Sequence, residues 1–157
     1  MIEDKIVVKE AELRTIVLPL LVGKVFHATD FNGYKGIMSL GVIESNKEGK
    51  RQSTYPQSEN SYGRKRGFVC LFDLRDRKDE DVEWTLKKYY FLRIRYYEDM
   101  VFYFILKDSK YCEIISAETA KSQTGGSEVF IPESECWYPG DLKIDFIEKI
   151  LCVTIKA

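Results

Sequence analysis

His27 is the only histidine of this chain, and its side chain is the one best suited to proton transfer or ligand binding near neutral pH. It lies in the segment 25–30 (VFHATD), a pattern typical of a short buried strand that leads directly into a capped helix. Alternation along a strand places the imidazole of His27 and the hydroxyl of Thr29 on the same face. Strand ends beside helix starts often hold ligands in α/β folds. A purely structural histidine is the alternative.

Two glutamates near the end of the chain are the second candidates for chemistry. In the segment 131–137 (IPESECW), the two-residue period of a strand places Glu133 and Glu135 on one face together with Trp137. Such a pair of carboxylates can act as an acid, a base or a fixed anion opposite a developing positive charge. The alternative is an ordinary solvated strand face that carries two glutamates.

Composition narrows the classes of function. The chain has 157 residues, enough for one domain with its own core, and a net charge of −1, which gives no overall field that attracts nucleic acid or a membrane. A single histidine excludes the metal hydrolases that depend on several histidine ligands, and we expect no metal site. The sequence contains no Walker-type loop, no G-x-G-x-x-G and no G-x-S-x-G motif.

Cysteine usage and hydropathy predict a cytoplasmic protein. The four cysteines are widely spaced among apolar residues, which favours buried, reduced thiols, although a disulfide pair stays open: Cys70, Cys112, Cys136 and Cys152. The apolar run 16–22 is interrupted by Pro19 and is too short to span a bilayer, and no segment resembles a secretion signal. We therefore expect no membrane partner.

Hydrophobic patterning predicts one α+β domain over residues 1–157, with more strand than helix and a few short helices. We expect a helix over 4–15, within a helical extension formed by residues 1–23, and a connector or short strand over 16–22. A second helix follows Asp30 or Asn32 as cap and ends at Gly41. Residues 84–97 suit a strand, but a helix over 80–90 is equally compatible. Short helical turns are expected within 117–127 and 141–147, and strands over 24–29, 42–43, 67–74, 100–106, 111–116, 129–138 and 150–155.

The only basic patch lies in the polar, turn-rich segment 44–67. Between positions 47 and 66 there are two acidic residues and six basic ones, namely Lys47, Lys50, Arg51, Arg64, Lys65 and Arg66. Long connections within compact domains are usually functional or disordered. An exposed solubilising loop is therefore the alternative to a binding role.

These features together resemble the ADP-ribosyltransferase-like fold. Its opening is similar to the H-x-T strand at His27 and Thr29, followed by a helix that ends in a glycine, here Gly41. The closing segment 135–142 (ECWYPGDL), with 146–147 and 150–153, resembles the last part of the DNA-targeting ADP-ribosyltransferase toxins and related phage-defence proteins. The resemblance covers residues 24–43 and 124–155, and it implies a strand-rich split sheet.

The resemblance also implies roles for individual residues. His27 and Thr29 would hold NAD, and Glu135 would take the place of the catalytic glutamate that stabilises an oxocarbenium-like transition state as nicotinamide leaves. Glu133 lies where the family often has a substrate-contacting residue. We add that Tyr62 could stack on nicotinamide, and that Arg64 or Arg66 could pair with the pyrophosphate.

The resemblance therefore implies a transferase that uses NAD, acts as a bacterial toxin or phage-defence effector, and modifies a nucleic acid or protein acceptor. An antitoxin or other partner protein would fit this role. Three alternatives stay open: a catalytically silent binding module of the same fold, a related RNA 2′-phosphotransferase, and an unrelated nucleic-acid-binding domain that uses the basic segment.

Overall fold

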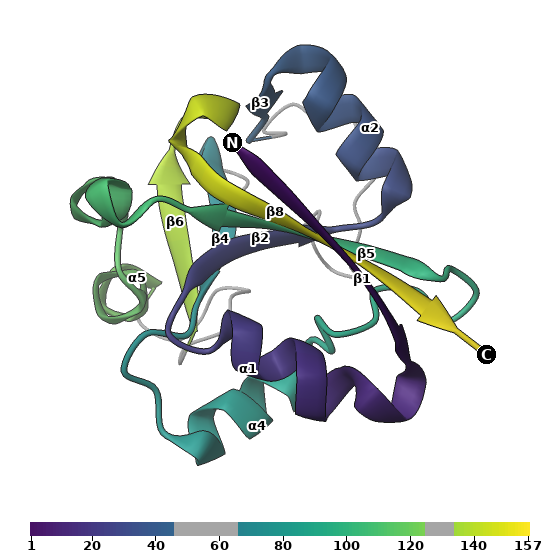
Figure 1. Cartoon of the computed structure of the whole chain (residues 1–157). Coiled ribbons are helices and arrows are strands. Elements are labelled where there is room, and N and C mark those ends of the chain that lie inside the picture. The colour runs from purple at the N-terminus through teal and green to yellow at the C-terminus, as the bar shows by residue number, and fades with distance from the viewer. Residues whose placement is uncertain (46–65, 125–133) are drawn as a thin grey trace.

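A six-stranded sheet organises the residues that the computed structural model describes, namely 1–45, 66–124 and 134–157 (Figure 1). Its strand order is β1-β8-β5-β2-β4-β6, and β3 and β7 form a separate two-stranded sheet. Neighbours in the large sheet are antiparallel, except β1 and β8, which are parallel. The strands are β1 (Ile2–Lys9), β2 (Val25–Thr29), β3 (Val42–Ile43), β4 (Phe68–Asp73), β5 (Met100–Leu106), β6 (Glu135–Pro139), β7 (Leu142–Lys143) and β8 (Ile147–Lys156). The predicted α+β class is confirmed.

The helical elements connect these strands and cover both faces of the large sheet. They are η1 (Glu10–Glu12), η2 (Leu13–Val17), α1 (Leu18–Leu21), α2 (Phe31–Leu40), α4 (Asp79–Lys88), η4 (Asp108–Glu113), α5 (Ala117–Thr124) and η5 (Ile144–Phe146). In Figure 1, α1 and α4 lie on one side of the sheet and α2 lies on the other. We call these two sides the α4 face and the α2 face.

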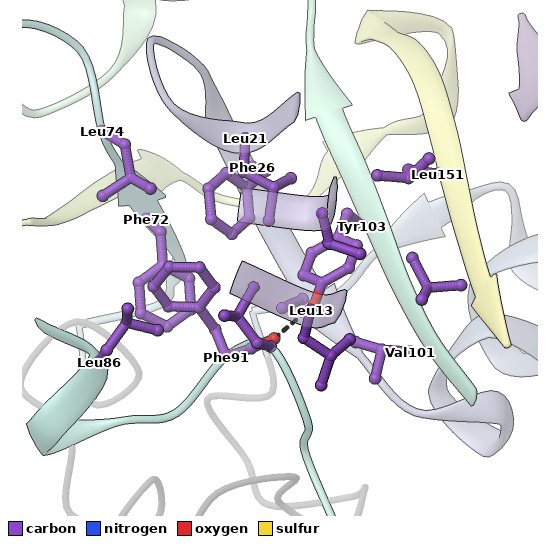
Figure 2. Packing of buried hydrophobic residues seen from close by; sticks show 14 of the residues in the cluster. Leu13, Leu21, Phe26, Phe72, Leu74, Leu86, Phe91, Val101, Tyr103 and Leu151 are labelled. Atoms are coloured by element: carbon purple, nitrogen blue, oxygen red, sulfur yellow. Dashed lines mark hydrogen bonds between the residues drawn. The ribbon is translucent and has the colours of Figure 1, made fainter. Parts of the chain in front are cut away.

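Aromatic rings fill the core on the α4 face (Figure 2). The ring centroid of Phe26 lies 5.4 Å from those of Phe72 and Phe91 and 5.7 Å from that of Tyr103. The Tyr103 hydroxyl donates a hydrogen bond of 2.6 Å to the carbonyl of Phe91, so its one polar atom is satisfied. This cluster joins β2, β4 and β5 to the segment that follows α4.

The α2 face has its own core, which fixes the position of α2. Ile37 is buried there together with Phe102 and Phe104 of β5. The ring of Tyr34 stacks on Phe102 with centroids 4.2 Å apart and an angle of 11°. The helix therefore packs against the strand next to β2.

The predicted corner between β2 and α2 is confirmed. Asp30 is the N-cap, and its Oδ1 accepts a hydrogen bond of 2.8 Å from the backbone N–H of Gly33. The helix ends at Gly41, whose φ of 76° lies in the left-handed region that glycine tolerates. Strand β3 follows at once, as expected.

The N-terminal region differs from the prediction of a helix over 4–15 and a helical extension over 1–23. Ile2–Lys9 form β1, which pairs with β8 from Ile2↔Lys149 to Lys9↔Lys156. The partner strand lies at the far end of the chain, where a local pattern cannot reveal it. Helical structure starts only at Glu10 and continues to Leu21, so the connector predicted over 16–22 is largely helical too. Pro19 is tolerated because it occupies the first turn of α1.

Later segments bring one confirmation and three corrections. Helix α4 shows that the helical alternative for residues 80–90 is right. The strand predicted over 111–116 is wrong, because η4 extends to Glu113 and only Ile115 pairs with a strand residue, Trp137. Residues 141–147 hold β7 before the short helical turn η5. All four cysteines are free thiols, but Cys112 is exposed rather than buried.

No helix in residues 1–45, 66–124 or 134–157 has the length and apolar character that a membrane crossing needs.

Candidate functional site

Strands β2 and β4 separate in the middle of the large sheet. They pair only at Val25↔Asp73 and Phe26↔Phe72, although β2 continues to Thr29 and β4 begins at Phe68. On their outer sides both strands stay paired, β2 with β5 and β4 with β6 (Figure 1). The sheet is therefore two halves, β1-β8-β5-β2 and β4-β6, which share only a two-residue ladder. We call the region beyond this ladder the split.

His27 is the first residue of β2 beyond the shared ladder, and its ring spans the split. Its Nδ1 lies 3.2 Å from the backbone carbonyl oxygen of Cys70 on β4. Burial lowers the pKa of His27 below its ordinary value of 6.5, against the opposing effect of the Cys70 carbonyl. The ring is therefore neutral at pH 7, and the carbonyl assigns the proton to Nδ1. In this tautomer Nε2 is a hydrogen-bond acceptor.

Glu135 lies two strands from His27, at the start of β6, and its carboxylate is held by a neighbour. The indole Nε1 of Trp137 donates a hydrogen bond of 2.6 Å to Oε2 of Glu135. Glu135 is 8% exposed and Trp137 is fully buried. The predicted common face of these two residues is thus confirmed. The arrangement is a buried, oriented carboxyl group in an apolar and aromatic setting.

Tyr89 and Cys70 bring further polar groups toward this carboxylate. Burial raises the pKa of Tyr89, and the negative charges of Glu135 and Cys70 raise it further. Tyr89 therefore keeps its proton near neutral pH, as a phenol rather than a phenolate.

The side chains of His27 and Glu135 point to opposite faces of the sheet. His27 pairs with Phe104, which belongs to the core of the α2 face. Glu135 pairs with Phe72, which belongs to the core of the α4 face. The two groups therefore do not face each other on one side of the sheet.

Thr29 lies on the α2 face, as the alternation predicts, but it is buried beneath the first turn of α2. Its side chain packs against the backbone of Gly33, where an added Cβ would overlap Oγ1 of Thr29. In the structure Thr29 packs the end of β2 against the first turn of α2, and this contact fixes the position of the end of β2.

The other candidate residues lie mostly outside the part of the chain that the structure describes. This applies to Tyr62, Arg64 and Glu133, as well as to the rest of the basic patch except Arg66. Arg66 is exposed and lies in the turn that directly precedes β4. The predicted roles of these residues in binding NAD or its acceptor stay predictions.

Two buried carboxylates near the split were not predicted from the sequence as site residues. Asp30, at the open end of β2, accepts from Nε of Arg95 at 3.3 Å while its other oxygen caps α2. Asp73, on the last rung of the shared ladder, accepts two hydrogen bonds from Arg75, at 2.9 and 3.0 Å. The alternation Asp73-x-Arg75-x-Arg77, which begins in the strand expected over 67–74, is the sequence signal for the second network.

No family model, curated protein or solved structure matches this chain. The function must therefore be argued from the site itself. Within the described residues, no group of three or more histidine, cysteine, aspartate or glutamate side chains is placed to hold a metal ion. The groups available for chemistry are the neutral imidazole of His27 and the fixed carboxylate of Glu135.

Proposed function

We propose that this chain is an ADP-ribosyltransferase-like protein that takes NAD as its substrate. The observation that carries the proposal is the split, because the β2–β4 ladder ends one residue before His27 and a fixed carboxylate lies on the next strand, β6. A dinucleotide in the split could meet the imidazole with one part and the carboxylate with another. This arrangement also agrees with the split sheet that the sequence resemblance implies.

Glu135 would supply the charge that the reaction needs. The bond between nicotinamide and C1′ of the ribose breaks, nicotinamide leaves with the bonding electrons, and positive charge develops on the sugar. An anion whose position is already fixed stabilises this charge without reorganising during the reaction. The acceptor then forms a bond to C1′ and releases its proton.

His27 would bind rather than react. Its Nε2 can accept a hydrogen bond from a ribose hydroxyl, while Nδ1 is occupied by the Cys70 carbonyl. The acceptor is a nucleic acid or a protein, and a toxin or phage-defence role with a partner antitoxin fits this chemistry.

The test is nicotinamide release from NAD, measured by chromatography with a panel of nucleic acid and protein acceptors. Glu135→Gln removes the charge and keeps the shape, so we expect it to abolish release while the circular dichroism spectrum stays native. Glu148→Gln is the matched control, because Glu148 is exposed on β8. A fully active Glu135→Gln protein would refute the catalytic assignment.

A silent binding module of the same fold is the second candidate. It is favoured because the side chains of His27 and Glu135 lie on opposite faces of the sheet. An extended ligand can contact both faces, whereas a reaction at one atom needs its groups close together. Calorimetry separates the two, because heat of NAD binding without nicotinamide release supports the silent module. The nucleic-acid-binding alternative depends on residues 47–66, of which the structure describes only Arg66.

A further inference from the structure

Trp137 combines full burial with a polar contact to the proposed catalytic carboxylate. Its indole Nε1 lies 2.6 Å from Oε2 of Glu135, at the short end for a nitrogen donor. Buried indole N–H groups usually find a partner, but the partner here is a charged group at the start of a strand. Packing of the indole ring in the core does not by itself require this hydrogen bond to a carboxylate.

The indole itself is held rigidly from several sides. Its ring stacks on Phe68 with centroids 5.5 Å apart and an angle of 28°. Its backbone N–H donates to the Ile115 carbonyl at 3.0 Å, and its carbonyl accepts from the Ile115 N–H at 2.7 Å. On the other side it pairs with Cys70 of β4. The hydrogen bond therefore transmits the rigidity of β4 and β6 to the carboxylate of Glu135.

We propose that Trp137 is a positioning residue, whose indole N–H holds the Glu135 carboxylate in the orientation that nicotinamide departure requires. This inference rests on the proposed function. A charge-assisted hydrogen bond of this kind favours the anion and restricts its rotation. Loss of the donor should therefore slow the chemical step and leave NAD binding nearly unchanged.

The first test examines the contact without using activity. The chain has two tryptophans, so its ¹H–¹⁵N spectrum contains two indole signals, and Trp84→Phe assigns them. Trp84 is 45% exposed, so its indole proton should exchange quickly in D₂O while that of Trp137 persists. Glu135→Gln should shift the Trp137 signal and accelerate its exchange. An unmoved signal would overturn the proposal, even if Trp137 variants fail to fold.

The second test uses the kinetics of nicotinamide release. Trp137→Phe keeps an aromatic ring but removes the donor, and we expect kcat to fall by about 100-fold, as for a misplaced catalytic group. The KM for NAD should stay within about twofold, because the contact acts in the transition state and not on the binding of NAD in the ground state. Trp84→Phe, the matched control, should behave like the wild type.

The outcomes separate this inference from the proposed function. Nicotinamide release by the wild type, loss of it in Glu135→Gln and full activity of Trp137→Phe would overturn the positioning role and leave the function standing. Absence of release by the wild type with every acceptor would remove the proposed function, and the role of Trp137 with it.

Discussion

Replacing Asp73 with asparagine tests the buried ion pair at the closed end of the split. Asp73 is 2% exposed, and its two oxygens accept from Nε and Nη2 of Arg75 at 2.9 and 3.0 Å. Nη2 of Arg77 lies 3.5 Å from Oδ2. Asparagine keeps the shape, but its amide nitrogen must face an N–H of one of the two arginines. The substitution therefore removes the negative charge that pairs with the arginines, and it places an N–H donor of asparagine against an N–H donor of an arginine.

The size of the effect follows from burial. Breaking a buried ion pair by removing one partner costs about 3–5 kcal/mol. The Arg75 side chain is 30% exposed and keeps part of its hydration, so we expect a loss of about 2–3 kcal/mol in the free energy of unfolding. For a domain of this size the corresponding fall in Tm is roughly 4–12 °C.

Urea unfolding followed by circular dichroism measures this loss, and Glu118→Gln is the control. Glu118 pairs with Arg77 at 3.2 Å in the same network, but its side chain is 73% exposed. Its loss should cost less than about 1 kcal/mol. If the two variants lose equal stability, then burial does not determine the strength of this network and the reasoning is refuted.

Three further predictions concern stability. Gly33→Ala should cost about 1–3 kcal/mol in thermal unfolding despite alanine's better helix propensity, because its Cβ would overlap the Thr29 hydroxyl, and Thr29→Ala in the same chain should recover most of the loss. Burial lowers the pKa of His27 below 6.5, so the unfolded chain takes up a proton more readily than the folded one. Stability should therefore fall by up to about 1.4 kcal/mol per pH unit below this value relative to His27→Gln, and a pH-independent difference between the two proteins would contradict the argument. Tyr103→Phe should cost about 1–2 kcal/mol in urea, because the buried carbonyl of Phe91 loses its donor, and an unchanged midpoint would show that water replaces it.

Local sequence predicts the corner between β2 and α2 because its causes are local. The apolar strand, the Asp30 cap and the left-handed Gly41 all act within a few residues of one another. By contrast, the strand at residues 2–9 depends on β8 as its partner, and the alternating pattern alone was compatible with a helix. The short bridge at Ile115 similarly depends on Trp137.

The same difference between local and long-range causes applies to the candidate site. Alternation places Thr29 with His27 and Trp137 with Glu135, and both assignments are confirmed. How these two pairs face each other depends on the register across β2, β4 and β6, which connects distant segments. The register places the two pairs on opposite faces of the sheet, and it also ends the ladder between β2 and β4 after two residues.

The position of β8 between β1 and β5 has a consequence for how the protein is made. β1 hydrogen-bonds only to β8 in the described sheet, so it has no partner there until the distant segment that forms β8 has been synthesised. Bringing such distant segments together costs loop-closure entropy and slows folding. During translation the exposed β1 is thus a segment that a chaperone, or the edge of another sheet, can capture before β8 emerges.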